Sequence, residues 1–449
     1  MLRRCVISCA LLMLVLPAAA RTRPHYGGTL RVEIAGDPWQ RPDGLARRLV
    51  FDGLTAIGTD GAVKPALAVE WSADDDDHRW QFRLRPGVHF QDGTPLTSVN
   101  AAAALNAACP SNCPWTAVRA VGSAVVFVGD APMPALPALL ADDAFRLALT
   151  INAEGKTPEG SVGTGPFQVA GFNNSVLTLT ANENCWQGRP FVDSVELRVH
   201  RAVRDQWLDL SVGRADMVEV SAEMTRQAQQ QRLNVIAQPD ATLLALQVND
   251  SGPLANPILR TALAEAIDRS ALANVIFQKQ GEPVAGLLPQ RVSGYAFLFP
   301  VERDLNRAHE LRGGLSLPPL TMSAESGDAA MQLAAQRIAL DLHEAGFTVQ
   351  MVAGNELRTN LTLRRFMLEG GAPGAMLETV LRAANEQPAV IGDGPADLYQ
   401  AEHEALERHT LIPLLDLPRA YAVGARVRDL RLNADGEPDI ANASLEDAP

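Results

Sequence analysis

Side chains that could perform covalent or metal chemistry are scattered along this chain of 449 residues. Its eight histidines include no HExxH pair of the kind that binds catalytic zinc. His403 and His409 do not share a helix face as an i, i+4 pair would, because they are six residues apart. No GxSxG turn and no supported Ser-x-x-Lys pair stands out. The sequence therefore predicts no catalytic residue, no metal site and no cofactor.

The five cysteines offer one candidate disulfide. Cys109 and Cys113 lie four residues apart in a proline-containing loop, a spacing that permits a disulfide without requiring one. A zinc site would need further cysteines or histidines nearby, and the sequence has none there. Cys185 would remain unpaired, and we expect it to be buried and unreactive.

The first 20 residues have the features of a secretory signal. Arg3 and Arg4 precede an apolar run at 6–16, which is too short to span a bilayer. Small residues at 17–20 predict cleavage after Ala20, and a short membrane anchor is the alternative. The two cysteines of this segment do not follow the apolar run, so lipidation is not expected. Export without a lipid anchor predicts a periplasmic protein.

Charge and length limit the partners and the architecture. The formal net charge is −13, and removal of the two signal arginines leaves −15. An acidic surface disfavours nucleic acid and anionic membrane as partners. The mature chain of about 430 residues is too long for one core, so two or three domains are expected.

The stretch RWQFRLRPGVHFQDG has the two-residue period of a strand with one buried face. Trp80, Phe82 and Leu84 alternate with polar residues. Pro86–Gly87 ends the strand, and Asp92–Gly93 supplies a tight turn. The pattern by itself predicts a hairpin.

The remaining elements alternate between strands and helices, as in an α/β protein. Strands are predicted at 28–35, 62–71, 124–128, 145–151, 166–169, 176–180, 195–199, 243–248, 347–352, 412–415 and 421–423. Helices are predicted at 97–108, 202–210, 221–230, 257–267, 271–278 and 328–345. The last has the clearest apolar face.

Two further segments have distinctive sequences. GTGPF at 163–167 is followed by NENCWQGRP at 182–190, where glycine and proline set the backbone and the block is expected to be structural. A phosphate-binding loop is not supported, since the third glycine of that motif is missing. The second segment, NPILRTALAEAIDR at 256–269, predicts that Asp268 caps a helix and that Arg269 forms a local ion pair.

Together, in this order, these segments resemble the family 5 extracellular solute-binding proteins, the peptide- and nickel-type receptors of bacterial ABC importers. Glu183 and Cys185 depart from the family pattern, which has a proline-type turn residue and an aromatic there. The resemblance covers most of 28–290 and returns at 321–353 and 411–430.

The resemblance implies a fold of two α/β lobes around a cleft, the type II periplasmic-binding-protein fold, with an extra domain inserted in the first lobe. Carried onto this chain, lobe I would comprise 21–48, 152–239 and 410–449, the inserted domain 49–151, and lobe II 240–409. Crossings near 239–242 and 408–411 would form the hinge.

The resemblance also implies a function. A monomeric receptor would capture small peptides, or a similar small solute, by lobe closure and deliver them to an inner-membrane ABC permease. Two alternatives stay open within the same fold: a transport-inactive sensor or partner-binding protein, and a receptor for a metal chelate or sugar. A periplasmic hydrolase is the rival from another class.

One departure concerns the ligand. Peptide receptors carry a motif of the form W-x-x-D-Y-P-D-P in lobe II, whose carboxylate receives the peptide amine. Here 364–374 reads RRFMLEGGAPG, without tryptophan or aspartate. Glu369 is either the substitute acid or an ordinary surface glutamate.

The remaining candidates follow from where the clefts of the family open. Asp37 and Trp39 follow the first strand, and an ordinary turn is their alternative. Asn249 ends a strand at the lobe crossing, where a turn cap is equally expected. Packing in a core is the alternative for Trp115 and Tyr421, and an exposed position is the alternative for Arg419. The complete set of predicted ligand-binding residues is Asp37, Trp39, Trp115, Asn249, Glu369, Arg419 and Tyr421.

Overall fold

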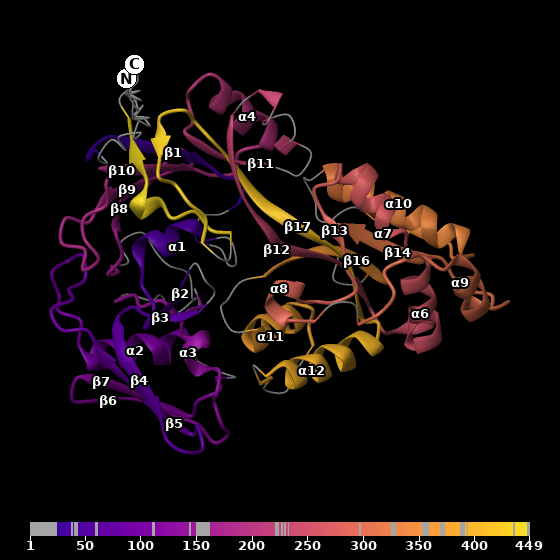
Figure 1. Ribbon diagram of the computed structural model, residues 1–449, viewed down its shortest axis with the longest axis horizontal. Helices are drawn as coiled ribbons and strands as arrows, with labels where there is room; N and C mark the ends of the chain where they lie inside the picture. The colour runs from indigo at the N-terminus through magenta and orange to yellow at the C-terminus, as the bar shows by residue number, and fades with distance from the viewer. Residues whose placement is uncertain are drawn as a thin grey trace, which may run out of the picture.

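Two long antiparallel strands, β12 (Asn234–Val248) and β17 (Leu411–Val423), run through the middle of the molecule and join its two halves (Figure 1). The structure is a computed structural model. It describes residues 25–36, 39, 44–58, 62–109, 113–142, 145–149, 162–220, 224–225, 228, 230–231, 233–295, 298–324, 329–352, 359–368, 373–386, 391–392, 394–433 and 436–446. The predicted signal segment therefore lies outside the described residues.

Both halves share one eleven-stranded sheet, built outwards from the β12–β17 pair. On the lobe I side its strands are β11 (Met217–Val220), β1 (Thr29–Glu33), β10 (Ser194–Arg198), β9 (Val176–Ala181) and β8 (Phe167–Asn173). On the lobe II side they are β16 (Leu361–Met367), β14 (Leu320–Ala324), β15 (Val349–Met351) and the short β13 (Glu282–Pro283), which pairs with β17. Parallel pairs occur in each half: β1 with β10 and β11, and β14 with β15 and β16.

Helices cover both faces of the sheet in lobe II, which explains the apolar run at 243–248. Leu244, Leu246 and Val248 belong to one buried cluster, whereas Leu243 and Ala245 belong to another. A strand buried on both faces needs apolar residues at every position. The first face is covered by α6 (Pro257–Ala266), α9 (Leu305–Arg312) and α10 (Ala329–Glu344), and the second by α11 (Pro373–Ala383) and α12 (Pro395–Glu407), with α7 (Arg269–Ala271) and α8 (Gln290–Ser293) as short connections (Figure 1).

The small domain forms around the hairpin-like stretch identified in the sequence. Its sheet has the order β4 (Ala68–Ala73), β5 (Arg79–Leu84), β7 (Ala124–Val128), β6 (Ala117–Val121). The alternation of β5 is confirmed, because Trp80, Phe82 and Leu84 are buried and their neighbours are exposed. The helices α2 (Ser98–Ala108) and α3 (Leu136–Leu139) and the hairpin β2 (Thr55–Ile57)–β3 (Val63–Pro65) complete it.

Two sequence predictions about the small domain have clear outcomes. Thr97 caps α2 through a reciprocal capping box with Asn100. Cys109 and Cys113 form the disulfide at the end of that helix, and Cys185 is free and buried.

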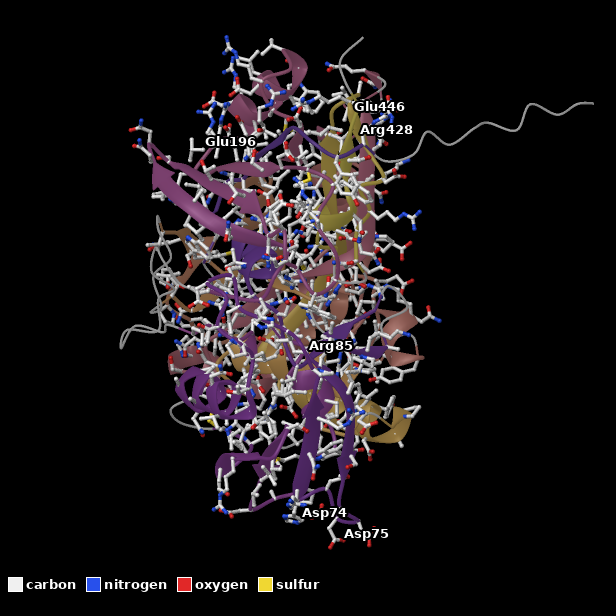
Figure 2. All side chains as sticks on the ribbon, turned by 90° about the vertical axis from the view of Figure 1, so that its left-hand side faces the viewer. Asp74, Asp75, Arg85, Glu196, Arg428 and Glu446 are labelled. Atoms are coloured by element: carbon white, nitrogen blue, oxygen red, sulfur yellow. A yellow bond between two sulfur atoms is a disulfide. The ribbon has the colours of Figure 1, made fainter. Side chains whose placement is uncertain are left out.

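The remaining lobe I elements are α1 (Leu45–Val50), α4 (Val203–Ser211) and the pair β18 (Val427–Arg428)–β19 (Ser444–Leu445). The last of these lies at one end of the molecule, where Arg428 pairs with Glu446 at 2.7 Å, opposite the small-domain loop that carries Asp74 and Asp75 (Figure 2). No helix among the described residues is long and apolar enough to cross a membrane.

Three predicted strands differ from the structure. Residues 412–415 and 421–423 are parts of the single strand β17, because Pro418 lies at a bulge opposite 239–241, where the ladder needs no N–H donor. The described residues of 145–151 form no strand; there the backbone N–H of Leu147 bonds to the carbonyl of Asp52 instead. The predicted helix at 221–230 falls mostly outside the described residues.

Candidate ligand site at the lobe crossing

β12 and β17 each pass from one lobe to the other. We locate this passage by the hydrophobic core in which each part of the two strands packs. Residues 243–248 and 411–417 pack in the lobe II clusters, whereas 235–236 and 420–423 pack in lobe I. The bulge between Gln238 and Thr242 marks the passage on β12. On β17 the change of core falls at 417–419.

One edge of β17 pairs with β12 on both sides of this passage, and the other edge pairs with two different strands in turn. β13 pairs with residues 415–416, and β11 pairs with 420–423. The residues between them lie in the gap where one pairing has ended and the other has not begun. Asp416 is the last paired residue before that gap.

Asp416 is a buried acid whose environment disfavours its charge. Its side chain belongs to a residue only 6 % exposed, and its Oδ1 atom has no hydrogen-bond partner among the described residues. Burial raises its pKa to about 7, helped by the carboxylates of Asp240 and Glu282 and opposed by Arg291. Arg291 itself lies 3.5 Å from the Asp240 carboxylate.

A second buried acid lies nearby on α12. Glu402 is fully buried, and its Oε1 accepts hydrogen bonds from the backbone N–H groups of Leu287 and Leu288. Its Oε2 accepts the hydroxyl of Tyr295 at 2.5 Å. Burial is the main cause that raises the pKa of Glu402. A Cβ at Gly286 would lie 2.8 Å from this carboxylate, which explains the glycine there.

Sequence reasoning missed both acids, although a signal existed for each. Glu402 shares a helix face with the buried Leu398 and Leu406, four residues to either side. Asp416 interrupts an apolar strand.

Arg419, a predicted ligand residue, lies on the lobe I side of the gap with its charge already balanced. It donates to the buried carboxylate of Glu437 and lies 3.9 Å from Glu219. Its guanidinium also lies over the ring of Tyr421, 5.7 Å from the centroid. The Arg419 side chain is only 11 % exposed, so the exposed position that was the alternative to ligand contact is not observed.

The predicted aromatic residues lie in separate cores. Tyr421 is 1 % exposed within lobe I. Trp115 fills the small-domain core, with ring centroids 5.0 Å from Phe127 and 5.2 Å from Phe145. Both side chains therefore pack in hydrophobic cores, which was the alternative to ligand contact.

The other predicted residues are also dispersed. Trp39 is half-buried, with its ring 6.3 Å from that of Phe51. Asn249 is exposed at the end of β12, and its N–H donates to the carbonyl of Asn360 at 2.9 Å. Asp37 and Glu369 lie outside the described residues.

The conspicuous sequence motifs hold the scaffold together. Gln91 donates to the carbonyls of Val50, Gly165 and Phe167, and accepts from the N–H of Gly163. A Cβ at Gly163 would lie 1.9 Å from the carbonyl oxygen of Val50, so only glycine fits.

The tryptophan block meets the same junction. Asp52 accepts from the hydroxyl of Thr164 and the indole of Trp186, both at 2.8 Å. Arg85 lies 4.7 Å from the centroid of the Trp186 ring. The block predicted to be structural therefore fastens lobe I to the small domain.

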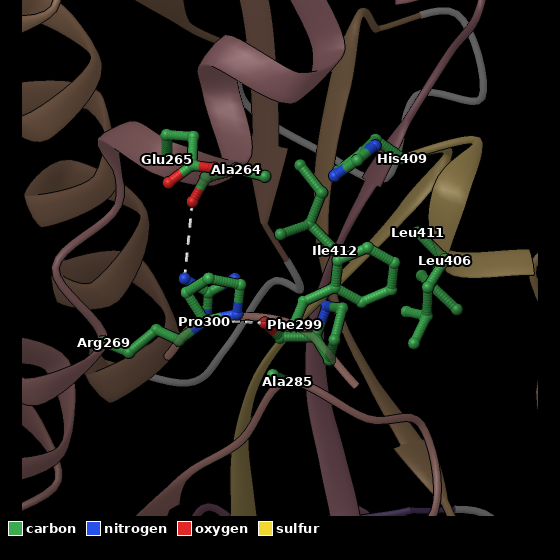
Figure 3. A pocket seen from close by; sticks show the side chains of 11 residues that line it. Ala264, Glu265, Arg269, Ala285, Phe299, Pro300, Leu406, His409, Leu411 and Ile412 are labelled. Atoms are coloured by element: carbon green, nitrogen blue, oxygen red, sulfur yellow. Dashed lines mark hydrogen bonds between the residues drawn. The ribbon is translucent and has the colours of Figure 1, made fainter. Parts of the chain in front are cut away.

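The AIDR segment is structural as well. Asp268 caps α7 by accepting from the N–H of Ala271 at 2.8 Å, as predicted. Arg269 is buried and donates to the carbonyls of Pro413 and Ala264 (Figure 3). Burial lowers its pKa to about 10.

A small cavity beside Arg269 is lined by Glu265, Phe299 and His409, among others (Figure 3). Its volume of about 40 Å³ has room for a few water molecules.

Residues 62–368 match the sequence model of the bacterial extracellular solute-binding proteins, family 5. The chain belongs to this family. Among solved structures, the family 5 fold matches the oligopeptide-binding protein AppA of Bacillus subtilis with a nonapeptide (TM-score 0.79, 16 % identity, 95 % of this chain and 100 % of AppA). It also matches AgaA of A. tumefaciens R10 with agropinic acid (0.82, 20 %, 94 % and 99 %) and NikA of Staphylococcus aureus with Ni(L-His)2 (0.78, 15 %, 93 % and 100 %). These similarities establish the two-lobe fold.

Curated relatives match this chain over only part of their own length. Protein XP55 of Streptomyces lividans is 26 % identical over 89 % of this chain and 77 % of XP55. The probable D,D-dipeptide-binding periplasmic protein DdpA of Escherichia coli is 24 % identical over 55 % of this chain and 52 % of DdpA. The glutathione-binding protein GsiB of Salmonella typhi is 27 % identical over 61 % and 58 %. The matched region thus spans about half the length of DdpA and GsiB.

Proposed function

We propose that this family 5 protein is the solute-binding component of an ABC importer, which captures a small solute between its lobes and presents it to an inner-membrane permease. The observation that carries the proposal is the β12–β17 pair. Two continuous strands join the lobes, and both are irregular where they change core, between Gln238 and Thr242 and around Pro418; a second irregularity, between Leu244 and Ala245, lies within lobe II. At the first of these levels both strands pass from the core of one lobe to the core of the other. Irregular backbone there is suited to a hinge.

Small peptides are the favoured ligand class. AppA, DdpA and GsiB are named for peptides or glutathione, whereas NikA and AgaA hold a nickel chelate and agropinic acid. The lobe II motif for a peptide amine is absent from 364–374, so the amine would need another acceptor. Asp37, Trp39, Asn249 and Glu369 stay predictions for ligand contact.

The site of action follows from the N-terminal signal. Cleavage after Ala20 would release a monomer into the periplasm, where a permease could recognise the closed form. A transport-inactive sensor is the second candidate, favoured by the altered lobe II motif. Adjacent permease and ATPase genes would favour transport.

The proposal is tested by releasing bound solutes from protein purified from a periplasmic extract. We expect native mass spectrometry to detect a bound mass, and small peptides to raise the melting temperature of the emptied protein. A ligand at about a hundred times its dissociation constant stabilises by about 2.7 kcal/mol. Absence of any bound mass, with no thermal response to the extract, would contradict the receptor function.

A further inference from the structure

Three acidic side chains from three neighbouring strands interact at the level where the lobes join. Asp416 of β17 is directly paired with Glu282 of β13, and Asp240 lies within the bulge of β12 opposite β17. Directly paired residues project from the same face of a sheet, with Cβ atoms about 5 Å apart. The carboxylates of Asp240 and Glu282 therefore both disfavour a charge on Asp416.

The neighbouring cations leave this repulsion uncompensated. Arg291 of α8 opposes it, but its guanidinium lies 3.5 Å from the Asp240 carboxylate and donates to the Asp240 carbonyl at 3.3 Å. Arg419, on the same strand as Asp416, is balanced by the two carboxylates described above. Glu402 of α12 adds a further acid to the surroundings. Among the described residues, the Oδ1 atom of Asp416 is buried and has no donor.

A charge on Asp416 would act on the weakest strand pair of the crossing. β13 has only two residues, and one of them, Pro283, has no N–H to donate to the ladder. The pair continues with one bond from the N–H of Val284 to the carbonyl of Leu414 at 3.1 Å. Like charges directly opposite each other destabilise a strand pair, and a buried charge without a donor adds the cost of its missing hydrogen bond.

We propose that protonation of Asp416 controls the strand pairing at the lobe crossing: uncharged Asp416 permits β13 to pair with β17, and charged Asp416 loosens that pair and the adjoining bulge of β12. The inference rests on the proposed receptor function for its consequence, because these strands form the proposed hinge. It adds a form of regulation, since the proton concentration would set how freely the lobes move about these strands.

Native-state hydrogen exchange of the solute-free protein tests the proposal, with the N–H of Val284 as the reporter. Exchange is measured from about pH 5 to about pH 8 and expressed as a protection factor, which removes the intrinsic pH dependence of exchange. The folded pKa of Asp416, about 7, exceeds the ordinary value of 3.8, so opening of the pair releases a proton below pH 7. We expect the protection factor to fall by up to about tenfold per pH unit as pH rises to about 7, and to level off above it.

Two variants assign the effect to Asp416. Asp416→Asn keeps the shape and removes the titration, so its protection factor at Val284 should not change with pH. It retains Glu402, whose pKa burial also raises, and therefore separates the two acids. Glu282→Gln, at an exposed position, should make the total fall about two- to fivefold smaller, the effect of one pair of like charges across two strands.

The matched control is Asp75→Asn, which changes an exposed aspartate in the distant small-domain loop (Figure 2). Its Val284 protection factor should follow that of the wild type at every pH. Circular dichroism checks that each variant is folded. If Asp416→Asn does not fold, Glu282→Gln decides the test, since a fall as large as in the wild type would overturn the inference.

The remaining outcomes separate this inference from the receptor function. A wild-type protection factor that does not change with pH, or an equal fall in Asp416→Asn, would overturn the inference and leave solute capture standing. The expected fall in a protein that binds no solute from a periplasmic extract would support the proton-controlled pairing and refute the receptor function.

Discussion

At the scale of single residues, two acidic side chains, Asp416 and Glu402, are buried in the folded protein. Asp416 lacks a donor at Oδ1, whereas Glu402 has three donors. The two acids therefore have different roles. Glu402 organises the chain at 286–288 and Tyr295, whereas the Oδ1 atom of Asp416 has no donor among the described residues.

Asp416 should make stability depend on pH. Its folded pKa of about 7 exceeds the ordinary value of 3.8, so between these values the folded state binds one proton more than the unfolded state. The free energy of unfolding should fall as pH rises from about 4 to about 7, by about 2–4 kcal/mol from this group. Urea unfolding of solute-free Asp416→Asn should show a smaller fall. Parallel curves for the two proteins would contradict this assignment.

The Glu402 bonds predict a local stability effect. Tyr295→Phe removes the hydroxyl that donates to Glu402 Oε2 and should lower the free energy of unfolding by about 1–3 kcal/mol. Tyr399→Phe is the control, since that ring contacts Tyr295 at 5.5 Å but is 44 % exposed. Urea unfolding at pH 7 should separate them, and equal effects would show that the bond contributes nothing.

At the scale of elements, the motifs that mark the family fasten elements to each other. Gln91 and Gly163 join the small domain to the end of α1, and Asp52 joins Thr164 to Trp186. These residues are far apart in sequence, so their contacts could not be read from the motifs. Their turn-forming composition did predict a structural role.

The junction predicts a matched pair of glycine substitutions. Gly163→Ala would place a Cβ 1.9 Å from the carbonyl oxygen of Val50 and should cost about 3 kcal/mol or more of stability. Gly171→Ala, on β8, meets no atom within 4 Å and should change stability by about 0.5 kcal/mol or less. Thermal unfolding measures both. A Gly163→Ala protein as stable as Gly171→Ala would refute the close approach.

Periodicity predicted those elements whose environment is uniform along their length. The strand at 79–84 and the helix at 329–344 face one core each, and their patterns were clear. β17 was divided wrongly because Pro418 suggests a strand end, while the bulge that accommodates it depends on the partner strand β12.

The candidate site was less predictable than the fold. The sequence singled out Arg419 as a candidate, but its partners Glu437 and Glu219 come from distant elements. Asp416 acquires its properties from β13 and from burial, neither of which is visible in a single sequence.

At the scale of the whole molecule, the proposed receptor function requires lobes that move about the level of Gln238 and Pro418. The sheet is continuous through this level, so each half can remain rigid while a few bulged residues absorb the change. A solute that contacts both halves would favour the closed arrangement by its differential affinity.

Small-angle X-ray scattering of the emptied protein, before and after addition of the solute released from the periplasmic preparation, tests this most directly. We expect the radius of gyration to decrease on addition, and a buffer-only control to leave it unchanged. An identical scattering curve with saturating solute, bound according to calorimetry, would contradict capture by lobe closure.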